Sequence, residues 1–115
     1  MIRRMLPGAF AAAVFVLPLV VAGPAAAEEA AQTIVIKDHK FEPATVEVPA
    51  GKRVKLVIDN RDGTPEEFES KDLRREKVIP GNSKGSVWVG PLPKGEYAFV
   101  GEFHEDTAKG RLIAK

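Results

Sequence analysis

Short runs of alternating apolar and polar residues, separated by turns rich in Pro and Gly, recur from residue 33 to residue 114. This pattern constrains the fold more than any other feature of the chain, because side chains repeat every two residues only along a β-strand. The clearest run is residues 53–59, in which Val54, Leu56 and Ile58 share one face. The sequence therefore predicts an all-β fold, an antiparallel Greek-key β-sandwich of about seven strands.

The expected strands lie at residues 33–37, 45–48, 53–59, 77–79, 86–89, 96–100 and 111–114. Residues 38–43 are expected to form a loop, because Pro43 restricts the residue before it. Residues 64–69 are expected to form a second, acidic loop. After it, residues 70–75 could form one or two helical turns with Ser70 as the N-cap.

The first 27 residues have the three parts of a secretory signal peptide. These parts are the positive Arg3-Arg4 pair, the apolar residues 9–22 and the small residues 25–27. The alternative is an uncleaved membrane anchor, but the apolar stretch is short for a span of about 20 residues and contains Pro18. We expect cleavage after Ala27. This would leave one small periplasmic domain, residues 28–115, which does not itself span the membrane.

Charge and cysteine content exclude several classes of protein. The chain has 17 Lys and Arg residues against 16 Asp and Glu residues, and only two of the basic residues, Arg3 and Arg4, belong to the leader. This near balance, with no basic stripe, argues against a nucleic-acid partner. The chain has no cysteine, which excludes a thiolate nucleophile, an iron–sulfur cluster and Cys-ligated zinc.

Two acidic segments each follow an expected strand, and together they could hold a metal ion. Residues 102–106 place one histidine among three carboxylates, and residues 66–69 contain three glutamates. Metal binding needs donors from different parts of the chain, and a sandwich can bring two such loops to one end. The candidate ligands are His39, Glu66, Glu67, Glu69, Glu102, His104 and Glu105, with Asp106 beside them.

Carboxylates with one or two imidazoles suit ferrous or ferric iron, manganese, zinc or Cu(II). They do not suit Cu(I), which prefers sulfur donors, and both methionines of the chain lie in the leader. Each group also has a plainer interpretation. The glutamates could be a solvated surface, His104 a surface histidine and His39 a turn residue. The residues alone leave these alternatives open.

The order of several short motifs resembles that of the cupredoxins. The motifs are Phe41-x-Pro43, Val46-x-Val48-Pro49-Ala50-Gly51, Asn60-x-Asp62, Tyr97-x-Phe99 and Lys109-Gly110, and the resemblance covers residues 33–114. In that family a β-sandwich holds copper at one end, through a first His after an Asn-containing loop and a Cys, a second His and a Met from the last loop. The resemblance implies that Asn60 ties the two ligand loops together.

The same resemblance implies an altered metal site. The second His matches His104, whereas the Cys position is Gly101 and the Met position falls near residues 107–108. The region of the first His holds Glu66 and Glu67. Without a thiolate, a blue-copper electron-transfer site is not expected, and the harder donors favour a different ion or redox state.

Three segments resemble the cupredoxin-like proteins of bacterial periplasmic iron uptake still more closely, namely the EfeO-type cupredoxin domain and the FtrB-like component. These segments are residues 64–70, 81–83 and 101–105. The resemblance implies a bound copper or iron ion, a periplasmic iron- or copper-binding partner and a membrane iron permease. The protein would capture ferrous iron, or help to oxidise it, for that permease.

Two other functions remain open. A copper-handling protein would bind Cu(II) mainly through His39 and His104, because two imidazoles in one site favour copper. A docking module would use the sandwich without any metal. Enzymatic activity stays undecided, because oxidation of iron needs an electron acceptor that only a bound copper could supply here. No Ser–His–Asp arrangement is indicated.

Overall fold

The computed structural model describes residue 8, residues 12–18 and residues 29–115. Residues 12–18 have no regular secondary structure, and the rest of the predicted signal peptide, with its cleavage site after Ala27, lies outside the described residues. Within the described part of the chain, no helix has the length and apolar character needed to cross a membrane. The signal peptide and the domain boundary stay predictions.

Residues 29–114 form nine β-strands and one turn of 3-10 helix. The strands are β1 (Glu29–Lys37), β2 (Lys40–Glu42), β3 (Thr45–Val48), β4 (Arg53–Asn60), β5 (Glu66–Ser70), β6 (Arg75–Ile79), β7 (Ser83–Val89), β8 (Gly95–Gly101) and β9 (Lys109–Ala114). The 3-10 turn, η2 (Glu102–His104), lies between β8 and β9. Two strands exceed the expected number, because β2 and β5 form in segments that were expected to be loops.

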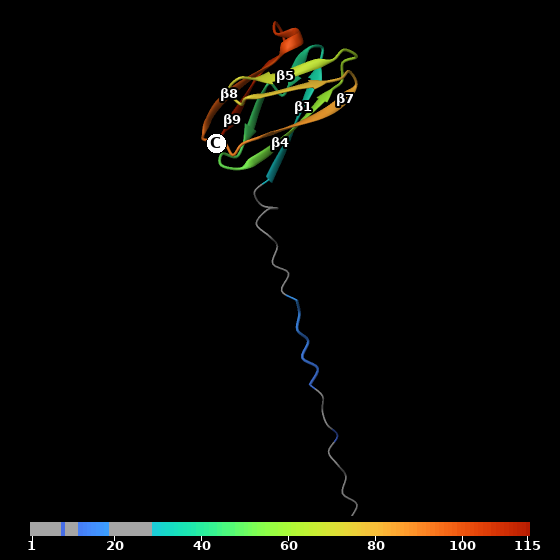
Figure 1. Cartoon of the computed structure of the whole chain (residues 1–115), viewed down its shortest axis with the longest axis vertical. Coiled ribbons are helices and arrows are strands. Elements are labelled where there is room, and N and C mark those ends of the chain that lie inside the picture. Colours follow the sequence, from blue (N-terminus) through green and yellow to red (C-terminus); the bar gives the residue numbers. More distant parts are fainter. Residues whose placement is uncertain (1–7, 9–11, 19–28) are drawn as a thin grey trace, which may run out of the picture.

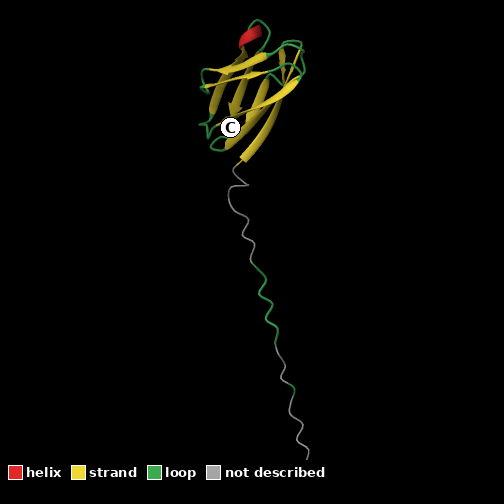
Figure 2. Cartoon of the chain, turned by 45° about the vertical axis from the view of Figure 1, so that its right-hand side comes forward, coloured by secondary structure: helices red, strands yellow, loops and turns green. Residues whose placement is uncertain are grey.

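The strands form two sheets that pack face to face (Figures 1 and 2). The four-stranded sheet has the order β2-β1-β4-β7, and the five-stranded sheet has the order β3-β9-β8-β5-β6. The pairs β1–β4 and β3–β9 are parallel, whereas the other pairs are antiparallel. Parallel pairing of β1 with β4 is possible because β3, in the other sheet, lies between them in the chain. The predicted all-β sandwich is confirmed, with one parallel pair in each sheet.

Alternate residues of both sheets meet in one apolar core. Phe41, Phe68 and Phe99 come from β2, β5 and β8, and their ring centroids lie between 5.0 and 6.4 Å apart. All three are almost fully buried, and burial of such a side chain stabilises the fold by about 1.5–3 kcal/mol. Phe68 also pairs with Gly101 across β5 and β8. The core therefore sets the register of the two acidic segments.

The acidic segment after β4 is a strand over most of its length, so the expectation of a loop at residues 64–69 is wrong there. From Glu66 onward, buried and half-buried residues alternate along β5. Burial of Phe68 between the sheets explains the difference, because an apolar residue between polar neighbours is the period-two pattern of a strand. Glu66 and Ser70 therefore face the sandwich interior, while Glu67 and Glu69 lie on the outer face of the sheet.

The short helix expected at residues 70–75 is wrong. A turn occupies residues 71–74, and β6 begins immediately after it. Ser70 does cap this turn, since its Oγ accepts a hydrogen bond from the backbone N–H of Leu73 at 3.0 Å. The same hydroxyl donates to the carbonyl of Ala98 at 2.6 Å. The chain reverses here because β6 pairs with β5 in an antiparallel hairpin.

Candidate metal centre

Two segments that are distant in the chain meet at one end of the sandwich, the end at which η2 lies in Figure 1. They are the start of β5 and the loop that leads through η2 to β9. A Cβ atom added at Gly101 would lie 2.6 Å from Cβ of Ala108 and 2.7 Å from Cδ of Glu66. Positions 66, 101, 104 and 108, which the resemblance matches to the regions of the copper ligands, are therefore neighbours in space.

Glu66 and His104 form a close pair at this end. Oε2 of Glu66 lies 2.5 Å from Nδ1 of His104. Oε1 of Glu66 accepts hydrogen bonds from the backbone N–H groups of Phe103 at 2.9 Å and of Glu67 at 3.1 Å. Glu66 is only 1% exposed, so these contacts compensate a carboxylate that would be costly to bury alone. The side chain of His104 is 25% exposed and can be reached from solvent.

The imidazole ring of His39 stacks on that of His104. The two ring centroids lie 3.5 Å apart, and the ring planes differ by 13°. Nε2 of His39 also lies 3.5 Å from Oγ1 of Thr64. Three of the predicted ligands, His39, Glu66 and His104, are therefore brought together by the fold.

A tight turn between β1 and β2 positions His39. Asp38 and His39 both have left-handed backbones, with φ angles of 52° and 57°, which are unfavourable for residues with a side chain. Their N–H groups donate to the two carboxylate oxygens of Asp62, at 2.8 and 2.9 Å. Oγ1 of Thr107 donates to the carbonyl of His39 at 2.6 Å. Asp62 and Thr107 together hold this turn beside the loop that carries His104.

Asn60, at the end of β4, supports the same region. Its Nδ2 donates to the carbonyl of Thr64 at 2.9 Å and to the carbonyls of Ile79 and Pro80, both at 3.2 Å. Its Oδ1 accepts a hydrogen bond from the N–H of Asp62 at 3.1 Å. These contacts link the segment before β5 to the end of β6 and do not reach the loop that carries His104, so the tying of the two ligand loops by Asn60 stays a prediction.

The sequence patterns do not indicate the roles of Asp62 and Thr107, which hold the turn that carries His39. Burial alone would raise the pKa of Asp62, but the hydrogen bonds from the backbone of His39 and Asp38 and the nearby positive charges outweigh burial and lower it. The available signal was the spacing Asn60-x-Asp62 at a strand end, which is typical of side chains that cap a turn. The partner of that cap, in a distant turn, could not be read from the spacing.

The remaining glutamates of β5 and η2 form a separate acidic face. Glu67 and Glu69 lie on the outer face of β5, where alternation places them opposite to Glu66. Glu67, Glu76 and Glu102 each have a carboxylate oxygen within 4.8 Å of the others, the one such trio among residues 8, 12–18 and 29–115. Glu76 was not predicted as a candidate, because the register of β6 against β5 is not visible in the sequence.

Like charges perturb this acidic face. Partial desolvation and the neighbouring Glu102 raise the pKa of Glu69, and contact with Glu67 is the main cause that raises the pKa of Glu102. The raised values mean that the carboxylates disfavour one another's ionisation. Exposed acidic groups of this kind are common without a bound ion, so the cluster by itself does not identify a metal site.

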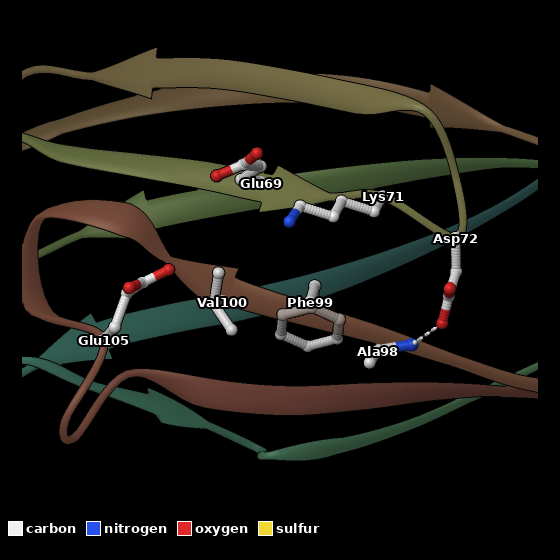
Figure 3. A pocket seen from close by; sticks show the side chains of 7 residues that line it. All are labelled: Glu69, Lys71, Asp72, Ala98, Phe99, Val100 and Glu105. Carbon is white, nitrogen blue, oxygen red and sulfur yellow. Dashed lines mark hydrogen bonds between the residues drawn. The ribbon is translucent and has the colours of Figure 1, made fainter.

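Glu69 and Glu105 line a pocket of about 280 Å³ on the outer face of the five-stranded sheet (Figure 3). Residues 98–100 of β8 form its floor, and Figure 3 shows Lys71 extending toward Glu69. Asp72 lies in the turn after β5, and its Oδ2 accepts a hydrogen bond from the N–H of Ala98 in β8 at 2.9 Å. Glu69 and Glu105 therefore border this pocket and are not part of the contacts around the two histidines.

A blue-copper centre does not fit the residues at this end. Gly101 offers no thiolate, and Ala108 offers no thioether. The carboxyl group of Glu66 lies so close to Gly101 that a side chain there would collide with it. Imidazole nitrogens with a carboxylate instead suit borderline or harder ions, such as Cu(II), Zn(II) or iron.

The stacked rings do not yet form a chelating pair. An imidazole binds an ion with a lone pair in the ring plane, at about 2.0–2.1 Å for zinc. Two planes that differ by 13° and lie 3.5 Å apart do not meet within that range. A shared ion would require one ring to turn. His39 is the freer of the two, because its ring has the longer 3.5 Å contact with Thr64, whereas His104 has the 2.5 Å contact with Glu66.

Comparison with known proteins gives a family and a fold. A family profile described as "Cupredoxin-like domain" matches residues 9–114. An uncharacterized protein of Rickettsia prowazekii (strain Madrid E), RP394, is 49% identical over 80 residues, which are 70% of this chain. The matched part spans 64% of the length of that relative.

Two solved structures show the same fold at low identity. The metal-binding domain of the Cu(I)-exporting P-type ATPase CopA of Streptococcus pneumoniae D39, with Cu(I), has a TM-score of 0.66 and 13% identity, over 74% of this chain and 84% of that one. Auracyanin A, a "blue" copper protein of Chloroflexus aurantiacus, has a TM-score of 0.65 and 14% identity, over 76% of this chain and 99% of that one.

Proposed function

The chain belongs to the cupredoxin-like domain family, and we propose that it is a periplasmic metal-binding protein of a bacterial iron-uptake system. One observation carries the proposal. His39 and His104 stack beside the buried carboxylate of Glu66, at the end of the sandwich that the resemblance matches to the copper end of the family. Both histidines are partly exposed, so an ion from solution can reach this pair of rings.

Proteins of the same fold support the metal-binding part of the proposal. The CopA domain holds Cu(I), and auracyanin A is a blue copper protein. Cu(I) in general prefers sulfur donors, and this chain has no cysteine. Its nitrogen and oxygen donors favour Cu(II) or iron instead.

The proposal also assigns the protein a role in iron uptake. The resemblance of residues 64–70 and 101–105 to periplasmic iron-uptake proteins supports it. The trio Glu67, Glu76 and Glu102 on the acidic face also supports this role, because clustered negative charge raises the local concentration of cations. In this role the protein captures ferrous iron, or helps to oxidise it, for a membrane permease. A second periplasmic protein that binds iron or copper would be its partner.

Copper handling is the second candidate function. A site with two imidazoles favours Cu(II) over iron, and the stacked pair of His39 and His104 supplies two imidazoles within one short distance. A docking module without metal is the remaining alternative. It draws support from the Glu66–His104 pair, because Glu66 contacts the ring of His104 and takes the space that a ligand side chain at position 101 would need.

Metal titration of the metal-stripped domain, residues 28–115, tests the proposal. Fe(II) and Mn(II) would be added without oxygen, and Fe(III), Cu(II) and Zn(II) in air. We expect tight binding of iron or Cu(II), weakened at least about tenfold, or about 1.4 kcal/mol, by His39→Ala and by His104→Ala. In a separate experiment in air, oxygen consumption on addition of Fe(II), faster than in buffer alone, would distinguish oxidation from capture.

Glu47→Gln is the matched control. Glu47 is an exposed carboxylate that pairs with Lys115 at 2.8 Å, away from the histidines, so its loss should leave metal affinity unchanged. Higher affinity for Cu(II) than for iron under competition would favour copper handling. No binding of any ion by the wild-type domain would contradict a metal site and leave the docking module.

A further inference from the structure

The carboxylate of Glu66 is fully engaged by the protein itself. Oε1 accepts two backbone N–H groups, those of Phe103 and Glu67, and Oε2 contacts Nδ1 of His104. Glu66 is almost completely buried, whereas a quarter of the side chain of His104 remains exposed. An ion that approaches from solvent therefore reaches the ring of His104 before it can reach the carboxylate.

The geometry around Glu66 favours a proton on Nδ1 of His104. A carboxylate oxygen accepts hydrogen bonds, Oε1 already accepts two, and the contact of Oε2 with Nδ1 is a hydrogen bond when Nδ1 carries the proton. A neutral imidazole carries one proton. With that proton on Nδ1, donated to Oε2 of Glu66, Nε2 keeps its lone pair. The hydrogen bond at one nitrogen of a histidine thus decides which nitrogen is free to bind an ion.

We infer that Glu66 is a positioning residue that acts through His104, holding its ring in the Nδ1–H form so that Nε2 is the metal-binding nitrogen. Glu66 then lies behind the ligand and does not touch the ion. The two backbone N–H groups on Oε1 fix the carboxylate, and Oε2 in turn fixes the ring plane of His104. A carboxylate bonded to Nδ1 also makes the imidazole more basic, so that Nε2 binds a metal ion more strongly.

The consequence for metal affinity rests on the proposed function. Loss of a carboxylate behind a histidine ligand typically weakens metal binding about 10–100-fold. The proton position in the metal-free protein does not depend on the proposed function, and it can be measured separately.

Glu66→Gln is the variant that tests the inference, because it removes the charge and almost preserves the shape. Two N–H donors face Oε1, so the amide oxygen of Gln should take that place and its NH₂ group should face His104. Nδ1 would then become an acceptor, and the proton would move to Nε2. We expect ¹⁵N NMR of the full-length, metal-free protein at about pH 8–9, above the ordinary range for imidazole protonation, to show Nδ1–H in the wild type and Nε2–H in the variant.

Wild-type protein alone keeps the inference testable if the variant does not fold. A neutral wild-type His104 with its proton on Nε2 would overturn the inference. A folded Glu66→Gln variant that keeps the Nδ1–H form would also overturn it, since the carboxylate would then not determine the form of the ring.

Zn²⁺, which has no redox chemistry, is the probe for the metal step. We expect Glu66→Gln to bind Zn²⁺ about 10–100-fold more weakly than the wild type. Glu47→Gln, which alters an exposed carboxylate that pairs with Lys115 away from the histidines, should bind it as the wild type does. In the Zn²⁺ complex of the wild type, the ¹⁵N signal of Nε2 should shift while Nδ1 keeps its proton.

The outcomes separate the inference from the proposed function. Unchanged Zn²⁺ affinity in Glu66→Gln, or loss of the Nδ1 proton in the zinc complex, would overturn the positioning role while the metal site stands. No Zn²⁺, Cu²⁺ or iron binding by the wild type, together with the Nδ1–H form, would contradict the proposed function and support the placement of the proton by Glu66.

Discussion

The resemblance matches Gly101 to the Cys ligand of the cupredoxins, and the carboxyl group of Glu66 lies in the space that a side chain at position 101 would need. Ala108, also fully buried, lies against the same point. At the scale of single residues, two small side chains make room for a buried carboxylate and its histidine partner. With no sulfur donor at these positions, this end of the sandwich offers nitrogen and oxygen donors, which suit a different class of ion than Cu(I).

Gly101→Ala should destabilise the fold. Its Cβ would lie 2.6 Å from Cβ of Ala108 and 2.7 Å from Cδ of Glu66, and an overpacked core typically costs about 1–3 kcal/mol. Urea unfolding would measure the loss. Gly63→Ala is the matched control, because a Cβ there meets no atom within 4 Å. Equal stability of the two variants would show that the space around Gly101 is not filled.

At the scale of elements, the tight turn between β1 and β2 and the strand β5 decide which side chains meet. Because side chains alternate along β5, Glu66 faces the interior of the sandwich and Glu67 lies on the outer face of the sheet. The turn that brings His39 over His104 is held by Asp62, which accepts the N–H groups of Asp38 and His39, and by Thr107, which donates to the carbonyl of His39. The site is therefore assembled from a strand, a turn and a loop, each held by its own hydrogen bonds.

Asp62→Asn should destabilise this turn in a pH-dependent way. An amide has one acceptor oxygen and would present an NH₂ group to the second N–H, so we expect a loss of about 1 kcal/mol at pH 7. The pKa of Asp62 is lowered below its ordinary value of 3.8 in the folded protein. The stabilisation is therefore fully present above that value and lost as the pH falls through the folded pKa.

Unfolding of both proteins between about pH 2 and pH 7 would measure the effect, and the curves should converge at the acid end. Glu96→Gln is the control. Glu96 pairs with Arg111 at 3.4 Å on the surface, and such a pair contributes little. A difference between wild type and Asp62→Asn that is independent of pH would contradict the role of the charged carboxylate.

At the scale of the whole molecule, the two histidines come from different sheets. His39 follows β1 of the four-stranded sheet, and His104 follows β8 of the five-stranded sheet. An ion held by both would link the two layers of the sandwich at one end. Binding to the folded state alone would then stabilise the entire domain.

Cu(II) should therefore raise the thermal unfolding temperature of the domain. At a free concentration about 100-fold above the dissociation constant, the gain is about 2.7 kcal/mol. Removal of the ion with EDTA should reverse it, and His104→Ala should abolish it, as followed by circular dichroism. The gain should persist in Glu47→Gln. A rise of the same size in His104→Ala would mean that the ion binds elsewhere.

Local patterns predicted much of the fold. The run at residues 53–59 is β4 to within one residue, and the all-β sandwich followed from alternation. Prediction was wrong at residues 70–75, because pairing of β6 with β5 overrode a weak helical preference. Other features depend on contacts between different segments, and the local alternation of residues does not indicate them. They are the parallel strand pairs and the register that places Glu69 opposite Glu76.

The sequence by itself determined the kinds of donor that this protein has: two histidines, many carboxylates and no cysteine. Only the tertiary structure decided which donors meet. It joins His39, Glu66 and His104, and it assigns Glu67, Glu69 and Glu102 to the outer acidic face. The physical reason is that distances between these side chains depend on strand register and on the packing of two sheets, whereas their chemistry depends only on residue type.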